Sequence, residues 1–444
     1  MTLEDILSKV GEFEDAVLSF VDEDGYPFSI PAEFSVTASG KIRLTRPEAL
    51  KQSLAGRRVN VIFNSITPLP GGGYTDRRYI VLWGEVAEEG DRLLFSPDRH
   101  YGWDEREVPF PQYCESSVPQ ARRYMKRLRE EENKQVEPHL PAPWLILRAT
   151  RLPFLVATWI PVLLGTAFAA FNGFFDLSLF ILTVLGASLA HLGVNTANDF
   201  FDHRHGADMI NVTPTPYSGG SRVIQYGLVS PNQMLGTSVT SVALAAIIGL
   251  YLAFTRGFAE ILLLIAVGTF LIFFYTASPI RLVYHGLGEL AVGFAFGPLI
   301  VMGTYFAQAQ AFSLQAVLAS LPVGILVAMI LYVNEIPDIR WDREAGKKTL
   351  PVLLDKENIL KGHTWSLAVT YGVVLLGVAS GMMPPITMLM LAAVPYAVKV
   401  HRSVEETFGD PYAMMPTMAS NIRLMILTGI QLTAAYVLAT LFPL

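Results

Sequence analysis

The chain has 444 residues, of which 52% are hydrophobic and only 16% are charged, and its formal net charge is −6. Soluble domains carry about 25% charged residues, so this composition argues against a purely soluble enzyme and against a disordered chain. The single cysteine, Cys114, excludes an intrachain disulfide and a metal cluster held by cysteines.

The charges are concentrated in the N-terminal third of the chain. Residues 1–145 hold 18 basic and 24 acidic residues, whereas the remaining two thirds hold only 15 of each. This contrast predicts a soluble domain followed by a membrane domain. We expect three parts, namely a β-rich soluble domain at 1–116, a basic helix with a proline-rich linker at 117–145, and a transmembrane domain at 146–444. The first twenty residues lack a basic segment followed by an apolar run, so no cleavable signal peptide is expected.

Alternating apolar residues predict that the soluble domain is built mainly from strands. Strands are expected at 16–21, 27–36, 41–45, 58–66 and 78–86. A short helix is expected at 47–55. This order resembles the pyridoxamine-phosphate-oxidase-like split barrel, a flavin-binding β-barrel. The resemblance implies that Arg46 and Lys51 contact the phosphate of a flavin cofactor; the alternative is that both are solvated surface charges.

The segment between the two domains is rich in basic residues and proline. A basic helix is expected at 119–133, followed by a hinge that contains Pro138, Pro141 and Pro143. The helix either rests on anionic lipid headgroups or serves as a solvated connector.

Apolar stretches long enough to cross a bilayer, about 20 residues each, recur beyond the linker. Nine spans are predicted, at 150–172, 177–198, 233–254, 258–278, 287–307, 314–335, 363–381, 384–400 and 421–442. Connections after even-numbered spans contain twelve basic residues, whereas those after odd-numbered spans contain only Arg256. The positive-inside rule therefore places the even connections and the N-terminal domain in the cytoplasm, with the C-terminus outside the cell membrane.

Two acidic segments stand at the predicted cytoplasmic ends of spans. The first, at 195–208, reads N-T-A-N-D-F-F-D-H-R-H-G-A-D, and the second, at 334–349, reads N-E-I-P-D-I-R-W-D-R-E-A-G-K-K-T. Both contain asparagine followed by an acid, two other residues and aspartate. Their separation by four spans is typical of an internal duplication.

Helical spacing puts the polar side chains of each segment on one helix face. The first face carries Asn195, Asn198, Asp199 and Asp202, and the second carries Asn334, Asp338 and Asp342. Two like charges 4 Å apart repel by about 4 kcal/mol at an effective dielectric of about 20, so these faces can meet only if cations lie between them. Oxygen ligands suit Mg²⁺, which often completes its coordination with phosphate and water. We therefore predict a Mg²⁺-diphosphate site beside a hydrophobic cavity.

At these two segments the sequence resembles the UbiA superfamily of membrane aromatic prenyltransferases, over about residues 146–444. The first segment matches the variant N-x-x-N-D-x-x-D-x-x-x-G-x-D of the family motif. With G-G-S-R at 219–222 and Y-T-A-S-P at 275–279, it is most similar to the 1,4-dihydroxy-2-naphthoate prenyltransferases of menaquinone synthesis. The second segment has Glu335 where asparagine or aspartate is common, which leaves the metal role of Glu335 open.

The resemblance implies an all-α membrane bundle of nine transmembrane helices with a cytoplasmic active site, fused to the N-terminal split-barrel-like domain. It implies Mg²⁺-dependent transfer of a polyprenyl group from a prenyl diphosphate to an aromatic acceptor. The implied partners are these two substrates and the lipid bilayer, and no nucleic acid is expected.

The resemblance also assigns roles to individual residues. The implied Mg²⁺ ligands are Asp199, Asp202, Asp338 and Asp342, assisted by Asn195, Asn198 and Asn334. The residues implied to neutralise the diphosphate are Arg222, Arg340 and Lys347. Asp208 is either a further metal ligand or a partner of Arg204. Tyr275 either faces the reacting carbocation through its ring or is an ordinary packing residue.

Three alternatives stay open. An ion-coupled transporter built on a repeat also carries carboxylates in duplicated helices, although its site would lie near the bilayer midplane rather than at span ends. Within the family, 4-hydroxybenzoate and a lipid-ether glycerol phosphate are other acceptors. The N-terminal domain could also be a flavin or ligand sensor that regulates the membrane domain.

Overall fold

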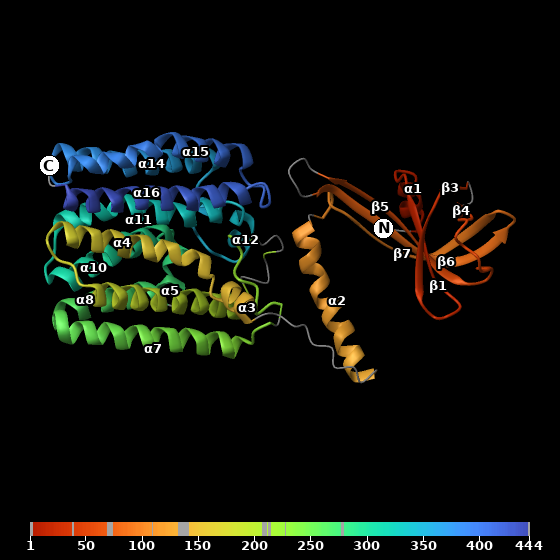
Figure 1. Cartoon of the computed structure of the whole chain (residues 1–444), viewed down its shortest axis with the longest axis horizontal. Helices are drawn as coiled ribbons and strands as arrows, with labels where there is room; N and C mark the ends of the chain where they lie inside the picture. The colour runs from red at the N-terminus through yellow and green to blue at the C-terminus, as the bar shows by residue number, and fades with distance from the viewer. Residues whose placement is uncertain are drawn as a thin grey trace. The chain divides into compact units, whose positions relative to one another are not determined.

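The computed structural model in Figure 1 describes residues 3–37, 40–68, 74–108, 110–131, 142–206, 211, 215–226, 228–276 and 279–442. Its backbone contacts divide the chain into two compact units, Met1–Tyr124 and Met125–Leu444. The helix α2 (Phe110–Glu131) crosses this boundary and contains most of the predicted basic helix.

The N-terminal unit is one antiparallel sheet of seven strands. They are β1 (Ala16–Val21), β2 (Pro27–Ala32), β3 (Phe34–Val36), β4 (Ile42–Thr45), β5 (Arg58–Pro68), β6 (Tyr74–Glu89) and β7 (Arg92–Asp104). Their spatial order is β2-β1-β5-β6-β7-β4-β3. The two edge strands, β2 and β3, are therefore consecutive in the chain and separated only by Glu33. Because one residue joins the two edges, the sheet must curl on itself, as Figure 1 shows.

The core of this unit fills the inside of the curled sheet. Leu18, Val61 and Leu82 are paired in register across β1, β5 and β6, and all three are fully buried. The short helix α1 (Leu3–Val10) adds Ile6 and Val10 to the same cluster. The prediction of a β-rich domain is confirmed, although the sequence patterns missed β7.

The predicted helix at 47–55 is wrong. The residues there form turns rather than a helix. The N–H of Leu54 donates to Glu88 Oε1 at 2.8 Å, and the carbonyl of Gln52 accepts from Arg46 Nη2 at 3.0 Å. These side chains satisfy backbone groups that a helix would pair internally, while Leu50 and Leu54 are buried in the core.

The regular secondary structure of the C-terminal unit is helical throughout its described residues, and Figure 1 shows its long helices running side by side. Its first half contains α3 (Ala142–Ala149), η1 (Leu152–Leu155), α4 (Val156–Phe171), α5 (Leu177–His205), α7 (Pro231–Arg256), α8 (Phe258–Thr276) and η2 (Leu282–His285). Its second half contains α9 (Gly288–Phe294), the π-helical η3 (Ala295–Leu299), α10 (Ile300–Ala309), α11 (Leu314–Glu335), α12 (Ile339–Glu344), α13 (Leu350–Leu353), α14 (Lys356–Ala379), η4 (Pro385–Ala393), α15 (Val394–Thr407) and α16 (Met415–Leu441).

Seven helices in the described part of the chain are long and apolar enough to cross a membrane. They are α5, α7, α8, the continuous run Gly288–Ala309, α11, α14 and α16. Two of the nine predicted spans fall short of this standard. The first is α4, which has 16 residues, and the other is divided between the 3₁₀ helix η4 and α15. Proline at the start of both η4 and α15 explains that division, because its ring cannot continue a helix from the preceding turn.

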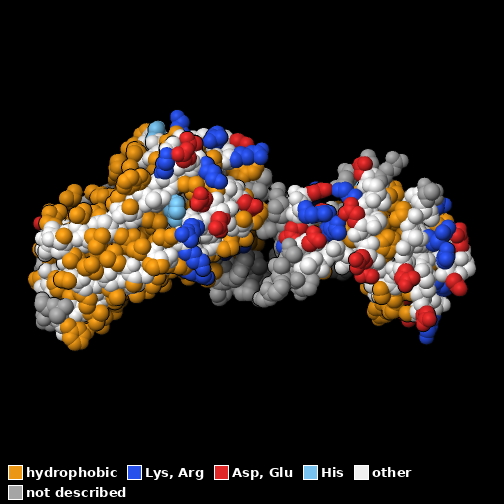
Figure 2. All heavy atoms as spheres, turned by 90° about the horizontal axis from the view of Figure 1, so that it is seen from above, with side chains coloured by type: hydrophobic (Ala, Val, Ile, Leu, Met, Phe, Trp, Pro, Cys, Tyr) orange, Lys and Arg blue, Asp and Glu red, His pale blue; other side chains and the backbone are white. Residues whose placement is uncertain are grey.

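Side-chain chemistry agrees with a unit that spans a bilayer. Figure 2 shows hydrophobic side chains over much of its surface, with charged side chains gathered at one end. α11 is the most buried of these seven helices. In its most apolar stretch of 18 residues 67% of the residues are buried, against 6% for α8. Gly324 of α11 packs directly against the α9–η3 backbone, and a Cβ atom there would lie 2.5 Å from the carbonyl oxygen of Gly293.

Candidate active site

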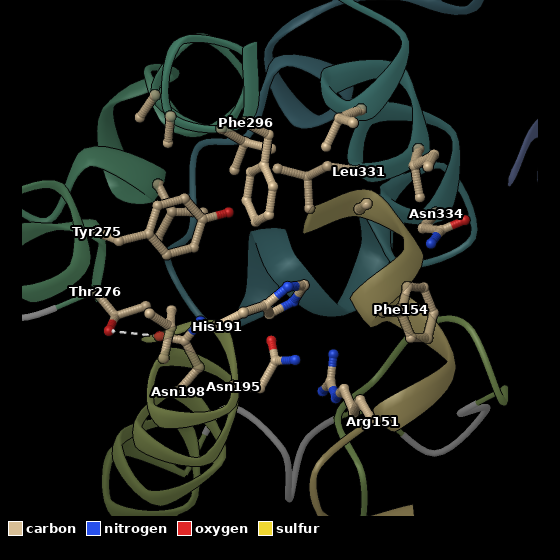
Figure 3. A pocket seen from close by; sticks show the side chains of 18 of the residues that line it. Arg151, Phe154, His191, Asn195, Asn198, Tyr275, Thr276, Phe296, Leu331 and Asn334 are labelled. Atoms are coloured by element: carbon tan, nitrogen blue, oxygen red, sulfur yellow. Dashed lines mark hydrogen bonds between the residues drawn. The ribbon is translucent and has the colours of Figure 1, made fainter. Parts of the chain in front are cut away.

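The C-terminal unit contains a cavity of about 420 Å³. Apolar side chains form most of its wall, and Figure 3 shows Phe154, Phe296 and Leu331 among them. Polar side chains of both acidic segments also line it, namely Asn195, Asn198, Asp202, Asn334, Glu335, Asp338, Asp342 and Lys347. The cavity therefore joins an apolar space to a group of carboxylates and amides.

Lys347 connects the two acidic segments. Its Nζ lies 3.2 Å from Asp202 Oδ2 of the first segment and 3.9 Å from Asp342 Oδ1 of the second. These three side chains are each less than a fifth exposed, so solvent screens their charges weakly. The prediction that the two segments meet at one place is confirmed for this part of the site.

Local structure explains how Lys347 reaches this position. α11 ends at Glu335, two residues before Pro337, whose missing N–H cannot extend the helix. α12 follows and carries Asp342 in its first turn. Gly346 then adopts a φ of 76°, and the N–H of Lys347 donates to the carbonyl of Asp342 at 2.8 Å. This glycine turn ends the short helix and returns the chain toward α5.

Asp338 is held by a residue that the sequence patterns did not single out. Asn211 Nδ2 donates to Asp338 Oδ1 at 2.9 Å, and both side chains are buried. The guanidinium of Arg222 donates in turn to the backbone carbonyl of Asn211. Arg222 itself does not line the cavity, so its described contact supports Asn211 rather than reaching the cavity directly.

Asp199 is almost completely buried and adjoins the cavity through Arg151, which lines it. Its Oδ1 accepts from Arg151 Nη2 at 3.0 Å and from the N–H of Ser221 at 3.4 Å. Arg151 does line the cavity, and no motif pointed to it, since it stands alone before η1 rather than in either acidic segment. It is thus a cationic site residue that only the fold reveals.

The remaining predicted residues fall into three groups. Tyr275 and Asn198 line the cavity, and Asn198 Oδ1 accepts from Thr276 Oγ1 at 3.2 Å (Figure 3). Arg340 does not line the cavity; its side chain is 75% exposed and pairs with Glu344. Asp208 lies outside the described residues.

Burial changes the acidity of the second segment. It raises the pKa of Asp338 to about 7, with the nearby charge of Asp342 as the next cause. Burial also raises the pKa of Asp342 to about 6, and the ammonium of Lys347 opposes this shift. Burial therefore makes the charged form of both carboxylates less favourable than it is in water, and a bound cation would offset this cost.

The oxygens of this region fit a hard divalent cation. Among the described residues of the two acidic segments, four carboxylate or amide oxygens are buried without a hydrogen-bond partner: Asp199 Oδ2, Asp202 Oδ1, Asn334 Oδ1 and Glu335 Oε2. Within the described ranges, no three His, Cys or acidic side chains lie close enough together to hold a metal by themselves. Mg²⁺ commonly binds through one or two carboxylates and completes its shell with water and substrate phosphates, so this donor set suits it when a diphosphate is present.

The contacts of the N-terminal unit do not support a flavin site. Arg46 lies 3.2 Å from Glu88 Oε1 and donates to the carbonyl of Gln52, so its guanidinium is engaged inside its own unit. Lys51 is exposed. The structure therefore does not support a flavin contact by Arg46 and Lys51.

The fold and the carboxylate-lined cavity are those of a membrane prenyltransferase, and residues 158–421 match the UbiA prenyltransferase family. The chain belongs to this family, as its motifs predicted. The matched residues lie entirely in the C-terminal unit.

Two curated relatives place the chain more closely. It is 29% identical over 299 residues to the 1,4-dihydroxy-2-naphthoate octaprenyltransferase of Bacillus subtilis, covering 66% of this chain and 93% of that protein. It is 30% identical over 294 residues to the 2-carboxy-1,4-naphthoquinone phytyltransferase of Synechocystis sp., covering 66% and 92%. A solved UbiA homolog from Archaeoglobus fulgidus bound to GPP and Mg²⁺ aligns loosely, with 15% identity, a TM-score of 0.43 and coverage of 65% and 98%.

Proposed function

We propose that this prenyltransferase transfers a polyprenyl group from a prenyl diphosphate to 1,4-dihydroxy-2-naphthoate, as a step in menaquinone synthesis, and that it requires Mg²⁺. The meeting of Asp202, Asp342 and Lys347 at the wall of a mostly apolar cavity carries this proposal. An apolar space suits a prenyl chain, and the charged groups beside it suit a diphosphate. The names of both curated relatives support a naphthalene-ring acceptor.

The proposed ligands of Mg²⁺ are Asp199, Asp202, Asp338, Asp342 and Asn334. When bound, Mg²⁺ supplies positive charge that stabilises the departing diphosphate. Lys347 is placed to donate N–H groups to the same diphosphate. Asn211 keeps the Asp338 carboxylate in position through its 2.9 Å hydrogen bond. Arg222 supports Asn211, and the surface position of Arg340 gives it no direct part in this scheme.

The reaction then depends on two features of the site, the positive charge near the leaving diphosphate and the apolar walls that exclude water from the cavity. The allylic C–O bond breaks, and its electron pair leaves with the diphosphate. A pair of ring electrons forms the new C–C bond to the prenyl carbon, and the ring regains aromaticity by releasing carbon dioxide or a proton. Apolar walls such as Phe296 and Leu331 keep water from capturing the carbocation as an alcohol.

We further propose that α4 and the η4–α15 segment complete nine membrane passages, with the N-terminal unit in the cytoplasm. The proposed parts are 1–116, 117–145 and 146–444. The distribution of basic residues supports this orientation. In a Cys114→Ser background, Lys361→Cys should react with a membrane-impermeant maleimide only from the cytoplasmic side, and Phe312→Cys only from outside. The opposite pattern would contradict the orientation.

A transfer assay tests the proposed activity. Membranes containing the protein are given Mg²⁺, a labelled polyprenyl diphosphate, and in turn 1,4-dihydroxy-2-naphthoate, 4-hydroxybenzoate or a lipid-ether glycerol phosphate. Label should move to the naphthoate and should stay on the diphosphate when EDTA removes the metal. Transfer to another acceptor would contradict the naphthoate assignment, and transfer to none would contradict the proposed reaction.

A further inference from the structure

The C-terminal half of α2, residues 121–131, is a helix whose described side chains all lie at the surface. Met125 and Leu128 are half-buried, and the other described side chains are exposed. The N-terminal half of α2 differs, because the hydroxyl of Tyr113 lies 2.7 Å from that of Tyr79 on the sheet. Most helices in proteins gain their stability by packing an apolar face against a partner. Residues 121–131 therefore offer a helix face on which such a partner can pack.

The apolar side chains of this half helix form one stripe. Ala121, Tyr124, Met125 and Leu128 follow one another at intervals of three, one and three residues. At 3.6 residues per turn these intervals keep all four within a sector of about 100°. Tyr124 is 54% exposed although it carries an aromatic ring. The stripe is thus narrow, apolar and open.

Basic side chains cover much of the remaining helix surface and reach both edges of the stripe. Two of them form pairs with Glu130 and Glu131, at 3.8 and 3.7 Å, and all four side chains in these pairs are more than half exposed. Exposed pairs of this kind are weak, so the positive charges remain available to a stronger partner. An apolar stripe flanked by basic residues is typical of helices that lie in a membrane interface. The exposed basic residues are Arg123, Lys126, Arg127 and Arg129.

The covalent chain keeps this half helix close to the bilayer. Glu131 ends α2 and Ala142 begins α3, so the extended chain allows at most about 40 Å between them. On α3, Ile146 is 57% exposed and Leu147 is 45% exposed, which suits contact with lipid. Because the membrane unit tethers α2, binding of α2 to the same bilayer is intramolecular and requires only a weak intrinsic affinity.

We propose that residues 121–131 bind the bilayer interface through anionic phospholipids, with Met125 and Leu128 among the upper acyl chains and the basic side chains on the headgroup phosphates. The charge pattern favours this partner, since positive groups beside an apolar stripe match phosphates above acyl chains. Long basic side chains can extend from the level of the stripe to the headgroups. This interaction is independent of the proposed reaction. The alternative cover for the stripe is a protein surface, which would not respond to the charge of the lipid.

Quenching of a fluorophore on the stripe tests the proposal in the full-length protein. Leu128→Cys in a Cys114→Ser background is labelled with nitrobenzoxadiazole and placed in nanodiscs whose lipids carry a nitroxide near the top of the acyl chain. With about 30% phosphatidylglycerol, the nitroxide should quench the emission by about half or more. In pure phosphatidylcholine, or in about 0.5 M NaCl, quenching should fall at least about twofold, because the attraction is then absent or screened. These comparisons need no variant of the basic residues.

A second label and two charge variants serve as controls. A label at Glu130→Cys, about 160° around the helix from Leu128, should be quenched at most about half as much. Replacing Arg123, Lys126 and Arg129 together by glutamine should reduce quenching at position 128 to its level in neutral lipid. The matched control removes three exposed basic side chains of the N-terminal unit and should leave quenching unchanged; it combines Lys51→Gln, Arg57→Gln and Arg58→Gln.

Three results would overturn the proposal. Equal quenching at position 128 in neutral and anionic nanodiscs would show insertion without recognition of anionic headgroups. A blue-shifted label that lipid nitroxides do not quench would show that protein covers the stripe. A label with the emission it has in water would show that residues 121–131 are a solvated connector.

Discussion

Lys347 Nζ lies 3.2 Å from Asp202 Oδ2, although 145 residues separate the two in the chain. Each belongs to a different acidic segment, and Asp342 Oδ1 lies 3.9 Å from the same ammonium. A lysine within 4 Å of two mostly buried carboxylates shows that this location stabilises a positive charge. The site therefore forms only when the C-terminal end of α5, which carries Asp202, lies next to the segment after α11, which carries Asp342 and Lys347.

Loss of either central carboxylate should stop the reaction. Asp202→Asn and Asp338→Asn keep the side-chain shape but remove a negative charge and a metal ligand, so kcat should fall by at least about 100-fold. Initial rates of Mg²⁺-dependent prenyl transfer provide the measurement. Glu357→Gln, which breaks only a surface pair with Lys361, should leave the rate within about twofold. Wild-type rates for either aspartate variant would refute the metal assignment.

Asn211 should affect the reaction through its hydrogen bond to Asp338. Asn211→Ala removes the donor that holds the Asp338 carboxylate, and a lost hydrogen bond to a charged group predicts a decrease in kcat/KM of about 5- to 100-fold. Raising the Mg²⁺ concentration should recover part of the rate, because the carboxylate is still present but less well oriented. A titration of rate against Mg²⁺ tests this, and an unchanged Mg²⁺ dependence would contradict the assigned role.

Close packing of α11 against α9–η3 gives a stability test. A Cβ at Gly324 would lie 2.5 Å from the Gly293 carbonyl oxygen and 2.9 Å from the Gly297 Cα, and backbone atoms cannot move aside alone. Gly324→Ala should therefore destabilise the unit by about 1–3 kcal/mol and lower its thermal unfolding temperature in detergent. Gly372→Ala on α14 meets nothing within 4 Å and serves as the control. Equal melting temperatures for the two variants would contradict this packing.

The sequence patterns predicted the features of the fold and the site that have a regular spacing along the chain. Spacing alone located the acidic segments and the apolar stretches, because helix faces and bilayer thickness impose regular periods. The sequence patterns did not identify Arg151 and Asn211 as site residues. Each is a lone residue whose partner, Asp199 or Asp338, is distant in the chain. Arg340 carries the right charge for a diphosphate, but no pattern shows that its helix position turns it toward solvent and Glu344.

The N-terminal unit supplies a prediction about pH. Hydrogen bonds from Arg77, chiefly from its side chain, hold the pKa of Glu105 below its ordinary value of 4.5. Because the folded-state pKa is the lower one, the pair stabilises the fold fully above pH 4.5 and loses this contribution as the pH falls through the folded-state pKa. Arg77→Gln should therefore destabilise β6 and β7 by about 1 kcal/mol at pH 7 and by less at pH 3.

Hydrogen exchange of the full chain measures this difference. Amides in β6 and β7 should exchange faster in Arg77→Gln at pH 7 after correction for intrinsic rates, and the gap from wild type should narrow toward pH 3. Lys126→Gln, which removes an exposed pair on α2, is the control and should show no such pH dependence. A gap that widens toward low pH would contradict the sign of the linkage.

The central claim is that both acidic segments act on one diphosphate. The affinity of a non-hydrolysable prenyl thiolodiphosphate, measured with Mg²⁺ for Asp202→Asn, Asp342→Asn and the double variant, tests it most directly. If the two carboxylates serve one site, the double variant should bind about as weakly as either single variant. If instead the losses of affinity in the two single variants multiply in the double variant, the two carboxylates act independently, and this result would contradict the account.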